Sequence, residues 1–283
     1  MNFHIYRPIA SLNPFVKHYY YWQENVSGPV QVPHHLFALG DQYLLFIQEG
    51  SLSCTPAGHA TFQLPPATIL GHFSGAHQLH ANGPVKMVAV QLNAYGSRKL
   101  LGLNMGTLTN YYRDLTKLDN PLWSELQTQL ENLPMPKQLC ACMNAALTTA
   151  MEQQHALKEV DQMADYIMKQ NGNVTMCKLA ELFQQSRHTL ERKFMEVIGL
   201  PPMLFARMLR FKQTIKALQQ MDHLQWQTAL EQNGYPDAAA FVRDFLSFNG
   251  QPVNYFTYET ESTAPVKNIV NMLLEQQQEV AVA

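Results

Sequence analysis

The segment 190–199, with the sequence LERKFMEVIG, recurs 51 residues later as FVRDFLSFNG at 241–250. Each copy has an apolar residue at its first and fifth positions, an arginine at its third and a glycine at its tenth. Apolar residues four apart share one face of a helix, and glycine commonly follows the last residue of a helix. The repeat therefore predicts two similar helices, each of which ends at its glycine.

A shorter helical stretch and a turn precede each of these predicted helices. In the first copy the stretch is 178–183 and the turn 184–186, and in the second copy they are 226–232 and 233–237. A short helix, a turn of a few residues and a second helix make the helix-turn-helix pattern. One such match is a weak signal, but two in this order and at this spacing form a strong one.

Residues 158–258 resemble the DNA-binding domain of AraC/XylS-type transcription regulators, which contains two helix-turn-helix units. The resemblance implies an all-α domain that binds double-stranded promoter DNA and contacts RNA polymerase, and it implies no enzymatic reaction. The residues that carry it are Leu179, Ala180, Ser186, Arg187, Leu190, Arg192, Phe194, Gly199, Pro202, Arg210, Phe211, Gly234, Tyr235, Asp237, Phe241, Arg243, Asp244 and Phe245.

The first copy offers several side chains suited to reading DNA. Ser186 is a favourable N-cap, which leaves the first turn of the following helix to enter the major groove. We expect Arg192 to bind guanine through two hydrogen bonds and Glu191 to accept one from cytosine. Outside a duplicated motif, the same side chains would be read as the solvated face of a helix. The residues expected to bind DNA are Arg187, His188, Glu191, Arg192, Lys193, Arg210, Ala238, Ala239, Val242 and Arg243.

The two copies differ in charge. Residues 187–216 hold seven Lys or Arg against two carboxylates, a local charge of +5, whereas 217–260 hold one arginine against five carboxylates, a charge of −4. The second copy also has alanine at 238–240, where polar residues stand in the family that it resembles. Because phosphates attract positive charge, we expect the first copy to supply most DNA binding. In the alternative interpretation, the second copy has lost DNA contact and binds protein.

Residues 1–120 alternate short apolar runs with Gly, Pro, Asn and Ser. The runs 43–47, 68–70 and 85–92 are bounded by turn signals at 40–41, 50–51 and 82–84, which predicts strands in a small cupin-like sandwich or barrel. The aromatic run 19–22 is interpreted as a core strand rather than as the lining of a ligand cavity.

The same segment resembles the N-terminal domain found in one branch of AraC-type regulators, through the residues at 19–22, 71, 95–102 and 108–110. This implies a sensor or dimerisation domain, with a small-molecule effector and a homodimer as expected partners. The fold expected for the chain is therefore α+β with two domains, in which a β-rich domain precedes an all-α double helix-turn-helix domain.

The sequence changes character again at 121–157 and at 259–283. Apolar residues in 121–157 take helical spacing, and we interpret this segment as a helical linker that joins the domains or offers a dimer face. Packing against its own domain is the alternative. Residues 259–283 form a C-terminal extension with helical spacing at 266–274.

Composition and motifs exclude several other classes of protein. Hydrophobic residues make up 46% of the chain and charged residues 15%, as in a folded globular protein. No signal sequence and no run of about 20 apolar residues is found, so we expect a cytoplasmic protein without membrane contact. The four cysteines form neither a disulfide framework nor a CxxC pair.

Histidines are frequent in the N-terminal part, and His72, His77 and His80 fall within nine positions of the chain. A metal site of the cupin type would need a carboxylate nearby, and this group has none. We therefore expect no metal, no cofactor and no enzymatic activity. A metal-binding cupin enzyme remains the alternative from another class of protein.

Overall fold

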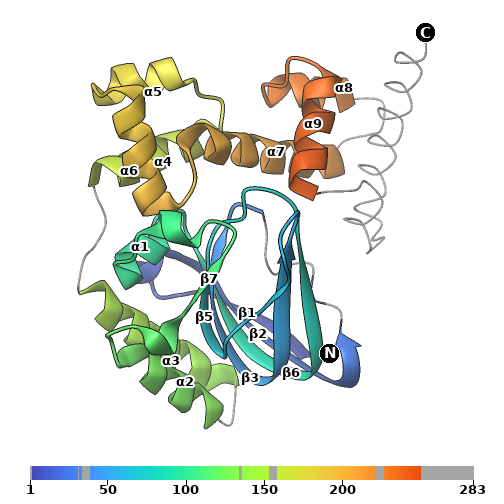
Figure 1. The fold of residues 1–283 in the computed structure, drawn as a ribbon, viewed down its shortest axis with the longest axis vertical. Helices are drawn as coiled ribbons and strands as arrows, with labels where there is room; N and C mark the ends of the chain where they lie inside the picture. Colours follow the sequence, from blue (N-terminus) through green and yellow to red (C-terminus); the bar gives the residue numbers. More distant parts are fainter. Residues whose placement is uncertain are drawn as a thin grey trace.

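The computed structural model describes residues 2–30, 32–33, 39–133, 136–152, 158–220 and 226–249. An antiparallel β domain comes first along the chain and a helical region follows it; the helices between residues 158 and 249 lie above one end of the sheet (Figure 1). This arrangement confirms the expected α+β fold class with two domains. Gly250 and the C-terminal extension lie outside the described residues.

The described strands form one seven-stranded antiparallel sheet, ordered β1-β2-β6-β3-β5-β7, with β4 paired to β3. They are β1 (Asn2–Tyr6), β2 (Val16–Val30), β3 (Gln42–Pro56), β4 (Phe62–Gln63), β5 (Ala67–Leu70), β6 (His77–Leu92) and β7 (Tyr112–Asp114).

Two turn signals of the sequence lie inside strands, which corrects the predicted strand ends. Gly50 of β3 lies close to the segment 82–84 of β6, where the pairing register shifts on either side of Glu49. Gly50 has a φ of +80°, and a Cβ there would lie 2.3 Å from the Pro84 carbonyl oxygen. Glycine thus marks an irregularity within two long strands rather than the ends of short ones.

The first part of strand β2, up to Trp22, is buried on both faces of the sheet. Tyr19 and Tyr21 pack towards α2 (Leu122–Glu131) and α3 (Pro136–Met151), while Tyr20 and Trp22 belong to the core on the other face. Side chains alternate between faces along a strand, so four consecutive aromatic residues supply both cores. The core interpretation of this run is confirmed. The packing of α2 and α3 on the sheet matches the alternative in which these helices cover their own domain.

The remaining helices are α1 (Gly96–Leu101), α4 (Lys158–Lys169), α5 (Met176–Phe183), α6 (Arg187–Ile198), α7 (Pro202–Gln220), α8 (Trp226–Gln232) and α9 (Ala238–Asn249), with the short 3-10 helices η1 (Ala10–Leu12), η2 (Met105–Leu108) and η3 (Leu115–Lys117). Helix, turn and helix therefore occur twice, as α5–α6 and α8–α9, and α7 joins the two copies. These elements confirm the helices predicted from the repeat.

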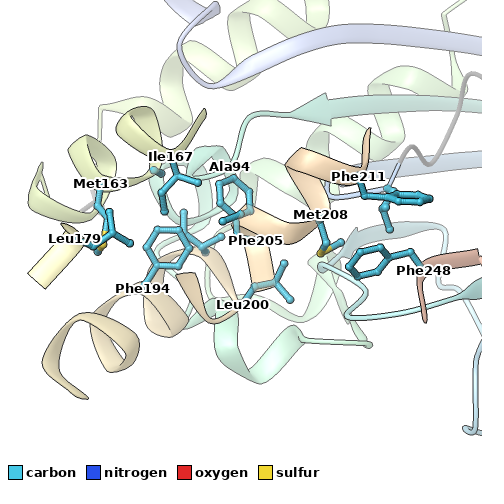
Figure 2. Packing of buried hydrophobic residues seen from close by; sticks show 14 of the residues in the cluster. Ala94, Met163, Ile167, Leu179, Phe194, Leu200, Phe205, Met208, Phe211 and Phe248 are labelled. Atoms are coloured by element: carbon cyan, nitrogen blue, oxygen red, sulfur yellow. The ribbon is translucent and has the colours of Figure 1, made fainter. Parts of the chain in front are cut away.

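One hydrophobic cluster extends through the helical region along α7 (Figure 2). The Phe205 ring lies 5.6 Å from the Phe194 ring of α6, and the Phe211 ring lies 5.4 Å from the Phe248 ring of α9. Ala94 of the β domain is also part of this cluster. Helix α7 therefore packs against both copies, and the β domain contributes to the same core.

Gly199 ends α6 as the repeat predicts, and it also faces the β domain. Its φ is +85°, and a Cβ there would lie 2.7 Å from the Met105 carbonyl oxygen of η2. The same left-handed backbone occurs at Gly58, with a φ of +75°, where a Cβ would meet no atom within 4 Å.

We predict that Gly199→Ala lowers the free energy of unfolding more than Gly58→Ala does. The Gly58 variant should lose about 1–2 kcal/mol from the left-handed backbone alone. The Gly199 variant should lose at least about 1 kcal/mol more, because the contact with η2 must shift to admit a methyl group. Urea unfolding of the two variants checks this, and equal losses would show that the α6–η2 contact is not tight.

Candidate nucleic-acid interface

The first copy has well-defined helix ends on both sides of its turn. The Thr175 hydroxyl accepts a hydrogen bond from the Lys178 amide at 3.2 Å and caps α5. Gln184 then takes a left-handed conformation, and the Ser186 hydroxyl accepts from the Thr189 amide at 3.2 Å to cap α6. Ser186 is thus the N-cap that the sequence predicts.

Helix α6 turns its predicted reading residues away from the core. Leu190 and Phe194 are fully buried, and Arg187, His188 and Arg192 are exposed. A helical period of 3.6 residues separates these two faces. The N-terminal half of α6 therefore presents two cations and one imidazole to solvent.

Most of the positive charge counted in the sequence is held in ion pairs. Five of the seven cations between 187 and 216 lie within 4 Å of a carboxylate oxygen, whereas Arg192 and Lys216 form no ion pair with a described residue. Three of the carboxylates lie outside the segment 187–216, so a local charge count misses them. The pairs are Arg187–Glu191 (2.9 Å), Lys193–Glu159 (2.7 Å), Arg207–Asp244 (2.5 Å), Arg210–Asp244 (3.9 Å) and Lys212–Asp41 (2.9 Å).

Two residues expected to bind DNA make contacts within the protein. The Arg210 guanidinium lies 4.8 Å from the centre of the Tyr235 ring, and the exposed fraction of its side chain is 24%. Val242 is 1% exposed and belongs to the helical core, so it is not available to DNA. The apolar face of α9 is wide enough to include Val242 beside Phe241, which corrects the sequence assignment.

The second copy repeats the construction of the first with different chemistry. The Asp237 carboxylate accepts a hydrogen bond from the Ala240 amide at 2.6 Å, and Asp237 lies 51 residues after Ser186. Ala238 and Ala239 are half-buried, and Arg243 is exposed. The N-terminal cap of α9 is therefore a carboxylate, whereas the N-terminal cap of α6 is a neutral hydroxyl. The carboxylate would repel a phosphate near the start of α9.

A buried carboxylate joins the two domains beneath α7. Asp41, just before β3, accepts hydrogen bonds from Lys17 at 2.5 Å and from Gln91 at 2.7 Å within the β domain, and from Lys212 of α7 at 2.9 Å. Burial alone would raise the pKa of Asp41, but Lys212 and Lys17 outweigh it and hold the pKa below its ordinary value. The carboxylate stays charged because both domains supply a cation.

The two ring nitrogens of His72 are buried and have no hydrogen-bond partner among the described residues. His72 is 1% exposed, and its ring centre lies 6.3 Å from that of Phe205 in α7. Burial lowers its pKa to about 3; Asp41 acts in the opposite direction, while Lys17 and Lys212 lower it further. His77 is lowered to about 4, again mainly by burial. Both imidazoles are neutral in the folded protein at pH 7.

We predict that these two histidines weaken the fold as the pH falls. The unfolded chain takes up protons below about pH 6.5, whereas the native histidines stay neutral until about pH 4 and about pH 3. Each should lower the free energy of unfolding by up to about 1.4 kcal/mol per pH unit between pH 6 and 4. Urea unfolding at several pH values in this range gives the slope of the free energy of unfolding against pH. His72→Leu should reduce this slope by the contribution of one proton. His59→Leu, at an exposed position, is the control, and an unchanged slope in the His72 variant would contradict the assignment.

The described residues contain no group of three or more His, Cys, Asp or Glu side chains that could hold a metal ion. His34 and His35 lie outside these residues. Among the described helices, none is long and apolar enough to cross a membrane.

Comparison with known proteins assigns a family model to the β domain alone. A model described as a domain of unknown function, DUF6597, matches residues 4–114. The match ends at the last residue of β7 and leaves out the helices that carry the repeat. No curated protein matches the chain.

Solved structures of ToxT from Vibrio cholerae have a similar fold at low identity. One is 11% identical with a TM-score of 0.41, and the match covers 88% of this chain and 94% of that one. A second, of ToxT bound to (E)-4-(8-methylnaphthalen-1-yl)but-3-enoic acid, is 11% identical with a TM-score of 0.40, and the match covers 88% of this chain and 95% of that one. A third, of ToxT bound to an unsaturated fatty acid, is 10% identical with a TM-score of 0.38, and the match covers 86% of this chain and 90% of that one. The likeness concerns the fold alone.

Proposed function

We propose that the protein is a sequence-specific DNA-binding transcription regulator that reads promoter DNA mainly with α6. The observation that carries the proposal is the exposed N-terminal half of α6, with Arg187, His188 and Arg192 on one face of a capped helix within a duplicated unit. Arginine can bind guanine through two hydrogen bonds, and a helix of this kind fits the major groove.

The difference between the two copies supports a primary role for the first. Helix α6 begins after a neutral cap, whereas α9 begins after Asp237 and offers Ala238 and Ala239 to a groove. Alanine can contact a thymine methyl group but forms no hydrogen bond with a base edge through its side chain. Arg243 is the exposed cation on α9 that remains to bind DNA.

A protein-binding role for the second copy is the rival proposal. Leu246 of α9 has an exposed fraction of 39% and offers an apolar side chain to a protein partner. RNA polymerase is the partner that the family resemblance implies for such a surface. A small-molecule effector and a homodimer contact belong to the same proposal, at the β domain.

Selection of bound sequences from random duplex DNA tests the proposed function. We expect enrichment of a defined site, and Arg192→Ala should weaken binding to it by about 1–3 kcal/mol and relax the preference at one base pair. The control is Arg113→Ala, which removes an exposed arginine from β7. A folded Arg192 variant with unchanged affinity and base preference would contradict the assignment of α6.

We predict that the salt dependence of binding separates the two copies. Each phosphate contact on duplex DNA contributes a slope of about −0.9 to the logarithmic plot of affinity against salt. Arg187→Ala combined with Lys216→Ala should remove up to about two contacts' worth of slope, and Arg243→Ala at most about one. Lys193→Ala should remove less than one, because Glu159 holds this cation at 2.7 Å and the Lys193 side chain is 26% exposed, whereas the paired Arg187 side chain is 72% exposed. A larger loss from Arg243→Ala than from the double variant would reverse the assignment of the two copies.

A further inference from the structure

The β domain binds the C-terminal end of α6 through two hydrogen-bond donors. The Thr109 hydroxyl donates to the Gly199 carbonyl at 2.6 Å, and the Gln42 side-chain amide donates to the Ile198 carbonyl at 3.1 Å. Carbonyl groups at the end of a helix have no partner within the helix and carry partial negative charge. The β domain therefore supplies donors for two carbonyl groups at the end of the first reading helix.

The β domain also binds the C-terminal end of α9. The Ala76 amide donates to the Ser247 carbonyl at 3.1 Å, and a Cβ on neighbouring Gly75 would lie 3.1 Å from the same oxygen. Ser247 lies 51 residues after Glu196 of α6, which pairs with Arg98 of the β domain at 3.2 Å. The β domain thus contacts both copies at equivalent positions of their last helical turns.

The two contacting segments of the β domain are joined by Asn110. Its side-chain oxygen accepts from the Ser74 amide at 2.7 Å, and its side-chain nitrogen donates to the Ser74 hydroxyl at 2.8 Å. The backbone amide of Asn110 donates to the His72 carbonyl at 2.8 Å. Asn110 follows Thr109 directly, and Ser74 lies two residues before Ala76. A continuous chain of bonds therefore runs from the end of α6 to the end of α9 without passing through α7.

The opposite ends of both reading helices are free of this contact. Ser186 and Asp237 cap the N-terminal ends of α6 and α9 within the helical region. Figure 1 shows α1 beneath α6, and it shows α9 above the upper end of the sheet. The β domain thus holds the two helices from the side opposite to the ends that would enter DNA.

We propose that the β domain is a clamp that fixes the orientation of α6 relative to α9, with Asn110 as the positioning residue that couples its two contacts. The proposal rests on the proposed function for its effect on DNA, where the clamp sets the separation of the two half-sites that can be bound together. The physical coupling between the contacts is a property of the protein without DNA.

Hydrogen exchange of the free, full-length protein tests the coupling. Thr109→Val keeps the side-chain shape and removes the donor to Gly199 at the end of α6. Because local opening controls amide exchange, the Ala76 amide should exchange about five-fold faster, the factor expected for one neutral hydrogen bond. Glu196→Gln, which weakens the pair with Arg98, is a second variant that should act in the same direction. The control is Thr107→Val, since Thr107 is exposed and its hydroxyl donates to Asn104 within the same turn.

Asn110→Gly tests whether the effect passes through Asn110. Glycine adopts the φ of +59° found at Asn110 without strain, so the variant loses the side-chain bonds to Ser74 and keeps the backbone. The Ala76 amide should exchange faster in this variant, and adding Thr109→Val should then have no further effect. Two results would overturn the clamp: an unchanged Ala76 amide in both folded α6-contact variants, or a five-fold effect of Thr109→Val that persists in the Asn110→Gly background.

Selection from random DNA links the clamp to function. The wild-type protein should enrich pairs of half-sites that are a single fixed distance apart. The Asn110→Gly variant should enrich pairs with a broader range of distances. If the unchanged protein enriches no sequence, the proposed function fails while the exchange data still decide the clamp. If it enriches a paired site and Asn110→Gly keeps the same single separation, the clamp does not set the geometry of binding.

Discussion

The packing of aromatic rings along α7 is the interaction on which the helical region depends. Phe205 contacts Phe194 of the first copy, and Phe211 lies within 6.0 Å of the rings of Phe241, Phe245 and Phe248 of the second. Each unit alone has two short helices with one apolar face, which cannot close a core. Because α7 supplies the other side of both cores, a change in its position would change the packing of both reading helices.

A buried carboxylate explains why the connecting helix is less available to phosphates than its composition indicates. Asp244 is 4% exposed, pairs with Arg207 and Arg210, and accepts a hydrogen bond from the Tyr235 hydroxyl at 2.9 Å. A buried charge needs partners, and here two arginines of α7 and one tyrosine of the turn supply them. The same contacts fasten α9 to α7, so these cations stabilise the fold before any nucleic acid is present.

The sequence predicts the features that depend on neighbouring residues and misses those that depend on distant ones. Helix period, the Ser186 cap and the glycine at 199 are local, and the structure has them as expected. The partners of Lys193 and Lys212 are Glu159 and Asp41, which lie 34 and 171 residues away in the chain. The irregularity at Gly50 was missed for a related reason, since a glycine that ends a strand and one that bends it look alike until the partner strand is known.

The three donors around Asp41 have a consequence for how the domains separate. Lys17 and Gln91 belong to the same domain as Asp41, and only Lys212 comes from α7. Removing the sole partner of a buried charge is strongly unfavourable, but a carboxylate that keeps one cation and one amide avoids most of that penalty. The β domain therefore retains a neutralised acidic group when α7 leaves it, and re-docking needs no new proton or ion. The charge of Asp41 therefore places no large penalty of its own on breaking the contact with Lys212.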